Sequence, residues 1–120
     1  MAQNSNGKPY DLEERTFKFT QAVIILTKKL PKTTANIEIS KQLIRASGSV
    51  GANYIEANES LGKKDFLLHI KISRKEAKES RYWLRLLDID NEGLDKERHN
   101  LVKEAQELMN IFGAILRKSE

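Results

Sequence analysis

Apolar residues recur at alternating intervals of four and three along most of this 120-residue chain. This spacing lines residues up on one side of an α-helix and is typical of helices that pack in a bundle. The first row is Leu12, Thr16, Phe19, Val23, Leu26 and Leu30, and the second is Ile39, Leu43, Ala46, Val50, Asn53 and Ala57. The last row is Leu101, Ala105, Leu108, Phe112 and Ile115. No strand-like alternation accompanies these rows, so the sequence predicts an all-α protein.

Short polar connectors separate the predicted helices. Pro31 should end the first helix near Leu30, because a residue before proline avoids the helical conformation. Asp11 with Glu14 matches a capping box at its start. Thr33, Thr34 and Asn36 offer caps for the second helix, Gly62 for the third and Asp95 for the fourth. We therefore expect an up-and-down antiparallel four-helix bundle over residues 11–120, after a flexible tail at residues 1–10.

The second predicted helix is rich in small residues, including Ala46, Gly48 and Gly51. Glycine inside a helix costs about 1 kcal/mol relative to alanine. Close approach of another helix at these three positions would explain the small side chains. The alternative is a helix that breaks near Gly48.

The third predicted helix, from residue 63 to about 87, has an apolar side that spans roughly 200° of its circumference. A single bundle core covers a stripe closer to about 100°. We expect the excess to contact another subunit, unless the helix is centrally buried within one chain. The candidate interface residues are Leu68, Ile72, Trp83 and Leu86.

The other side of this helix is basic. Residues 63–85 hold eight of the 21 Lys and Arg against three acids, a net charge of +5, whereas residues 88–120 carry −3. A basic helical face is a candidate for phosphate binding, although such a face is also compatible with simple solvation or with ion pairs to a neighbouring subunit. The candidate nucleic-acid-binding residues are Lys64, Lys71, Arg74, Lys78, Arg81 and Arg85.

Asn53 lies in the second apolar row, and Glu76 and Glu79 lie within the apolar arc of the third predicted helix, where buried charges need partners. We interpret them, with two further residues, as a structural network that fixes helix register or subunit geometry, with a ligand or metal site as the alternative. They are Arg45, Asn53, Glu56, Glu76 and Glu79.

Catalytic and membrane functions find little support in the residues. The chain has no cysteine, and its two histidines, His69 and His99, do not follow a glutamate by three positions as di-iron ligands do. Neither a Ser-His-acid set nor a phosphate-binding loop is recognisable. No apolar run approaches the roughly 20 residues of a membrane span, and the start does not resemble a signal peptide. We expect a cytoplasmic protein that is not an enzyme, with no catalytic residue, metal or cofactor.

The second and third predicted helices also resemble a known family. The residues that carry the resemblance are Gln42, Leu43, Arg45, Ser49, Val50, Gly51, Ala52, Asn53, Glu56, Ala57, Lys63, Lys64, Asp65, Phe66, Ser73, Lys75, Glu76, Ala77, Glu79, Trp83 and Leu84. Over Leu12–Leu116 the chain is similar to the bacterial four-helix-bundle proteins encoded in intervening sequences of 23S ribosomal RNA genes. Gly62 is a departure, since the family often has serine there.

This resemblance implies a homopentameric barrel of four-helix bundles without known catalytic residues. A family similar in fold, the accessory variability determinant of diversity-generating retroelements, is a basic pentamer that engages a reverse transcriptase and nucleic acid. The expected partners are therefore further copies of the chain, RNA or DNA, and a protein such as a nucleic-acid enzyme. A protein-only assembly scaffold is the alternative function.

Overall fold

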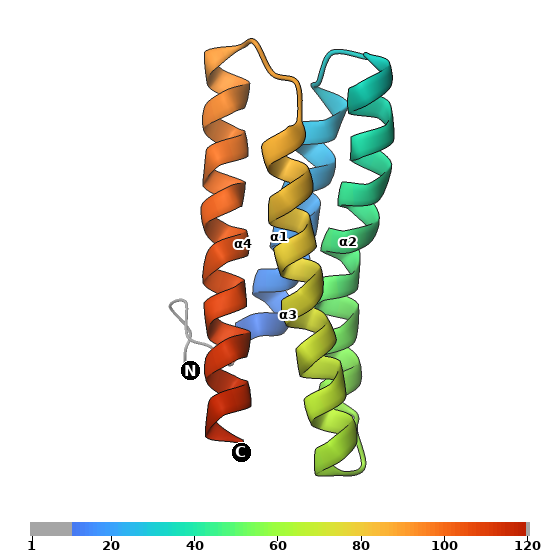
Figure 1. Ribbon diagram of the computed structural model, residues 1–120, viewed down its shortest axis with the longest axis vertical. Helices are drawn as coiled ribbons and strands as arrows, with labels where there is room; N and C mark the ends of the chain where they lie inside the picture. The colour runs from blue at the N-terminus through green and yellow to red at the C-terminus, as the bar shows by residue number, and fades with distance from the viewer. Residues whose placement is uncertain (1–10, 120) are drawn as a thin grey trace.

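The computed structural model describes residues 11–119, and these form four α-helices. The helices are α1 (Leu12–Lys28), α2 (Thr34–Asn58), α3 (Lys63–Leu86) and α4 (Glu92–Lys118). They run alternately up and down, with α1 behind the layer formed by α2, α3 and α4 in Figure 1. The described part contains no strand, which confirms the predicted all-α four-helix architecture. The predicted tail at residues 1–10 lies outside the described residues.

The predicted apolar rows face the centre of the bundle. All six residues of the first row are buried, as are Leu43, Ala46, Val50 and Ala57 of the second row. From α4, Leu101, Ala105, Leu108 and Phe112 are buried, and α3 adds Ile70, Ala77 and Leu84. Ile39, Asn53 and Ile115 are half-buried at the ends or margins of their rows. The spacing of apolar residues therefore identified the core correctly.

Two predicted helix caps are wrong. Asp11 makes no side-chain capping bond, because its backbone has left the extended conformation that a capping residue needs. α4 begins one turn earlier than predicted, since Asn91 is extended and its side chain accepts a hydrogen bond from the Leu94 amide at 2.9 Å. Asp95 instead pairs with Arg98 within the first turns of α4. The predicted cap at Thr33 is confirmed, since its hydroxyl accepts a hydrogen bond from the Asn36 amide at 3.1 Å.

α2 is continuous through its glycines, so the alternative of a break near Gly48 is wrong. A Cβ atom at Gly51 would lie 2.9 Å from Oγ1 of Thr16, which confirms close approach of α1 there. At Gly48 a Cβ atom would meet nothing within 4 Å, so the predicted close approach is wrong at that position within this chain. Hydroxyl groups of α1 and α3 bind backbone carbonyls in this small-residue segment of α2. Thr20 of α1 donates to the Ser47 carbonyl and Ser73 of α3 donates to the Val50 carbonyl, each at 2.9 Å.

Asn36 joins the two connectors at one end of the bundle. Its side-chain amide donates to the carbonyl oxygens of Pro31 at 3.1 Å and Asp88 at 3.0 Å, and its side-chain oxygen accepts from the Asp88 amide at 2.8 Å. Asn36 is only 2% exposed. The α1–α2 and α3–α4 connectors are thereby held together by one buried side chain, a role that the sequence did not reveal.

Candidate nucleic-acid interface

The six basic residues predicted to bind nucleic acid follow the length of α3 on one side. Five of them are exposed, and Arg81 is half-buried. Within residues 11–119 none of the six forms an ion pair. They are Lys64, Lys71, Arg74, Lys78, Arg81 and Arg85. The structure therefore brings the predicted set together as unpaired positive charge.

The basic side of α3 borders α4. Arg81 donates a hydrogen bond from Nη1 to Oε1 of Gln106, whose amide in turn donates to Oδ1 of Asn110 at 3.0 Å. Further along, Nε of Arg74 lies 3.7 Å from the position that a Cβ atom would take on Gly113. These contacts fix an antiparallel register in which α3 and α4 form the two walls of a shallow groove.

Two hollows lie along this α3–α4 groove. The first, of about 290 Å³, is lined by Lys71, Arg74, Lys75, Lys78, Met109 and Leu116. The second, of about 550 Å³, is lined by Arg81, Arg85, Val102, Lys103, Gln106 and Glu107. Lys64 lines a separate hollow with Leu67, Leu68 and Lys71 near the start of α3. Five of the six predicted bases thus line the groove directly.

α4 contributes basic residues that the sequence analysis missed. Lys103 lines the groove, and a guanidinium nitrogen of Arg117 lies 3.4 Å from the Cβ position of Gly113. The signal was present in the stripe of positions 103, 106, 110, 113 and 117, which has helical spacing, two bases and no acid. It was hidden because the net charge of −3 was taken over the whole segment rather than over one face.

Three acids of α4 pair with bases of α1, although one of them, Glu107, also lines the second hollow of the α3–α4 groove. Arg15 donates to both carboxylate oxygens of Glu104, at 2.7 and 2.9 Å, and to Glu107 at 2.6 Å. Lys29 pairs with Glu97 at 3.3 Å. The hydrogen bond to Glu104, with the attraction of both carboxylates, raises the pKa of the Arg15 guanidinium and outweighs the opposing effect of burial. These three acids therefore form ion pairs with α1, and the six predicted bases of α3 form none among the described residues.

The predicted oligomer-interface residues lie on the outer part of α3. Leu68 is 52% exposed and Leu86 is 47% exposed, while Ile72 and Trp83 are half-buried. The indole nitrogen of Trp83 is buried without a hydrogen-bond partner within the described residues. The alternative of a centrally buried α3 fails for Leu68 and Leu86. Contact of this surface with another subunit stays a prediction.

The predicted polar network divides into separate parts. Arg45 pairs with Glu79 at 3.2 Å and approaches the buried carboxylate of Glu76 at 3.6 Å. Asn53 lies apart from them: its amide donates to the Ser49 carbonyl at 2.9 Å, and its oxygen contacts Nδ1 of His69 at 3.0 Å.

The five residues therefore do not form one connected network within the described residues, and a role in subunit geometry stays a prediction. Glu56 is exposed because it lies on the solvent side of α2, and no hydrogen bond joins it to the others within residues 11–119. One oxygen of Glu76 has no hydrogen-bond donor among the described residues, so the ion pair with Arg45 satisfies that carboxylate only in part. Two α2–α3 contacts replace the one network.

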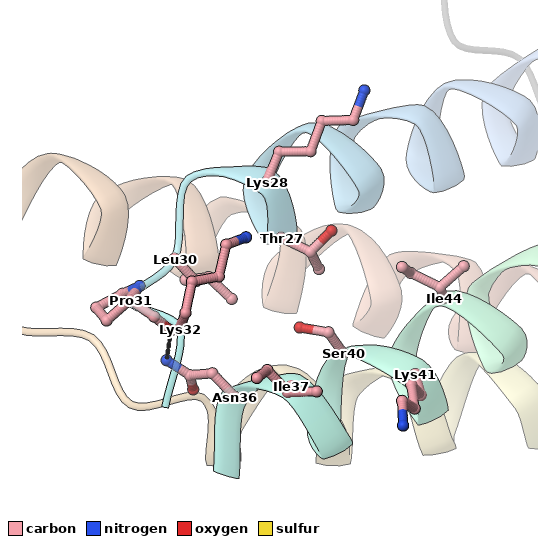
Figure 2. A pocket seen from close by; sticks show the side chains of 10 residues that line it. All are labelled: Thr27, Lys28, Leu30, Pro31, Lys32, Asn36, Ile37, Ser40, Lys41 and Ile44. Carbon is pink, nitrogen blue, oxygen red and sulfur yellow. Dashed lines mark hydrogen bonds between the residues drawn. The ribbon is translucent and has the colours of Figure 1, made fainter. Parts of the chain in front are cut away.

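A further groove lies between α1 and α2, away from the basic residues of α3. Its lining includes Ile37, Ile44 and Pro31, and Figure 2 shows the hydrogen bond from Asn36 to Pro31 at its end. Among residues 11–119 no group of three or more His, Cys, Asp or Glu side chains could hold a metal ion. No helix of that part has the length and apolar character to cross a membrane.

Comparisons with known proteins agree with this architecture. The chain is similar to a protein of unknown function from the S23 ribosomal protein family of Bacteroides thetaiotaomicron VPI-5482, known from a crystal structure. The two share 26% sequence identity with a TM-score of 0.77, over 91% of this chain and 97% of that one. No curated protein matches the chain. The 23S rRNA-intervening sequence protein family matches residues 9–114, most of the chain, and the protein therefore belongs to that family.

Proposed function

We propose that this protein is a non-enzymatic nucleic-acid-binding protein that engages phosphodiester backbones through the basic side of α3. One observation carries the proposal: six bases follow one side of α3 without an ion pair in residues 11–119. Glu107, the acid that lines the α3–α4 groove beside Arg81 and Arg85, pairs with Arg15 and with none of these bases among the described residues. Unpaired positive charge of this kind is the usual footprint of phosphate binding.

The dimensions of the row suit an extended polyanion. From Lys64 to Arg85 the helix rises roughly 30 Å at 1.5 Å per residue. Duplex DNA presents a charge about every 1.7 Å along its axis, so several phosphates lie within reach of one helix. The groove offers no stacked aromatic platform, and Tyr82 is the only aromatic residue near the basic arc. Binding should therefore depend strongly on salt and weakly on sequence.

A charge-reversal experiment tests this function. Lys71→Glu/Arg74→Glu/Lys78→Glu is compared with Lys18→Glu/Lys28→Glu/Lys41→Glu, which makes the same change in net charge at exposed positions of α1 and α2. Fluorescence anisotropy with labelled RNA and DNA at low salt measures the affinity. The α3 variant should lose binding while the α1–α2 variant keeps most of it. Equal losses, or no binding by the wild type, would refute the proposed interface.

We further propose that copies of the chain assemble through the outer part of α3. Leu68 and Leu86 are about half exposed within one chain, and contact with a second chain would remove this apolar surface from water. Exposed apolar residues also occur on α1 and α2, at Phe17, Ile25, Ile37 and Ile44. Two different apolar surfaces on one chain favour head-to-tail contacts, which form a ring when the rotation between successive subunits closes.

The family resemblance suggests five subunits, and repetition of the basic row around a ring would increase binding through avidity. Light scattering should give a mass of several times 13.8 kDa, the mass of one chain. A monomeric mass at micromolar concentration would refute assembly. An oligomer that binds no nucleic acid at low salt would leave a protein-only scaffold as the function.

A further inference from the structure

Two arginines from different helices converge on Gly113. The three heavy atoms nearest to the position of a Cβ atom on Gly113 all belong to them: Nη1 of Arg117 at 3.4 Å, and Nε and Cζ of Arg74 at 3.7 and 4.0 Å. Gly113 is buried beneath these side chains and lies five residues before the end of α4 at Lys118. Both guanidinium groups thus approach a single point on the α4 backbone.

This convergence brings two positive charges close together. Neither Arg74 nor Arg117 forms an ion pair within residues 11–119. Arg74 shares the adjacent hollow with Lys71, Lys75 and Lys78, and the charged residues that line this hollow are all basic. Only Lys75 among them approaches an acid, Glu76, at 3.9 Å. Like charges held this close repel each other, and an anion between them would relieve the repulsion.

Glycine at position 113 is unfavourable for the helix by itself. It is among the poorest helix formers, and the helix continues for more than a turn beyond it to Lys118. Its φ angle is not in the left-handed region, so the backbone does not require glycine there. A Cβ atom at this position would be in ordinary contact with both guanidinium groups, so alanine would fit, whereas a larger side chain would take the space in which they lie.

We propose that Arg74 and Arg117 form a two-helix clamp for one phosphate group of a nucleic-acid backbone, centred over Gly113. The inference rests on the proposed nucleic-acid function and adds α4 as the second half of the site. Each guanidinium is a rigid planar fork whose two parallel N–H groups match two phosphate oxygens, whereas a lysine binds phosphate as a point charge. The hollow of about 290 Å³ beside Arg74, with Met109 and Leu116 among its lining residues, offers room for the adjoining sugar.

The first test removes one charge at two neighbouring positions. Arg117→Gln is compared with Lys118→Gln, which has the same charge change at an adjacent exposed residue of α4. Anisotropy is measured with a labelled single-stranded RNA oligonucleotide. Arg117→Gln should weaken binding about tenfold, as expected for loss of a charged hydrogen bond, and lower the salt slope by about 1. Equal effects of the two substitutions would overturn the clamp.

The second test leaves the charge unchanged. Gly113→Ala places a methyl group in ordinary contact with the arginines and should preserve binding. Gly113→Leu fills the space over Gly113 and should displace both guanidinium groups, lowering the affinity about as much as Arg117→Gln does. Circular dichroism and light scattering check that both variants keep the wild-type helix content and mass. Wild-type affinity for Gly113→Leu would overturn the proposal.

Competition identifies the source of the phosphate. Unlabelled RNA should displace the labelled strand, whereas inorganic phosphate should displace it no better than chloride of equal ionic strength. Specific displacement by inorganic phosphate would mean that the site takes the free ion, and would overturn the assignment to a backbone. If the α3 charge reversals abolish binding but Arg117→Gln and Gly113→Leu do not, the clamp is wrong and the proposed function stands. If the wild type binds no nucleic acid, both the proposed function and the clamp are refuted.

Discussion

Two glycines in one helix provide a matched test of the packing between α1 and α2. At Gly51 a Cβ atom would lie 2.9 Å from Oγ1 and 3.2 Å from Cβ of Thr16, distances that force something to move. Thr16 is only 1% exposed, is β-branched, and donates its hydroxyl to the Leu12 carbonyl at 2.7 Å, so it has little freedom to adjust. Gly48, one turn away, has nothing within 4 Å.

The expected free energies of unfolding follow from these contacts. Gly48→Ala should stabilise the protein by about 1 kcal/mol, the difference in helix propensity. Gly51→Ala has the same gain but an overpacking cost of about 1–3 kcal/mol, so its net effect ranges from neutral to about 2 kcal/mol of destabilisation. The Gly51→Ala variant should therefore be less stable than the Gly48→Ala variant by about 1–3 kcal/mol.

Urea denaturation followed by circular dichroism measures this difference, with all proteins at one concentration because assembly shifts apparent stability. Thr16→Ala removes the hydroxyl that lies closest to the Gly51 position. In that background Gly51→Ala should be less harmful, with a coupling energy of about 0.5–2 kcal/mol. If Gly51→Ala stabilises the protein as much as Gly48→Ala does, and shows no coupling to Thr16, the described approach of α1 is wrong.

Three further predictions concern single contacts. Asn36→Ala should destabilise the protein by about 2–4 kcal/mol in the same assay, because it leaves three backbone groups of the buried connectors without their partner. Arg15→Ala should cost about 1–3 kcal/mol through loss of its bonds to two acids of α4, whereas Lys18→Ala, with one exposed pair at 3.7 Å, should cost less than about 0.5 kcal/mol. Leu68→Asp should lower the mass measured by light scattering without loss of helix content, since Leu68 is 52% exposed within the chain; an unchanged mass would remove Leu68 from the interface.

The apolar spacing predicted the fold well because core burial dominates the energetics of a bundle. Leu12, Leu43 and Leu108 are all fully buried where the pattern put them. Helix ends were less predictable, because several polar residues near a connector can cap and only local backbone geometry decides among them. Asn91 rather than Asp95 caps α4 for this reason.

The candidate site was predicted in part. The row of bases on α3 follows directly from helical periodicity, and Lys71, Arg74 and Lys78 do share one hollow. The contribution of Arg117 was missed, because its proximity to Arg74 depends on the antiparallel register of α3 and α4. Helical periodicity shows which residues share a face of one helix. The alignment of α3 with α4, which brings residues of two faces together, is seen only in the folded structure.

The salt dependence of RNA binding tests the central claim most directly. If six bases of α3 contact phosphates, the logarithm of the association constant should fall with the logarithm of salt concentration with a slope of about −4 for a single strand and about −5 for a duplex. Lys71→Glu/Arg74→Glu/Lys78→Glu should make that slope less negative by about 2–3, since three of the phosphate contacts are removed. A wild-type slope near zero, or equal slopes for the two proteins, would contradict binding through the basic side of α3.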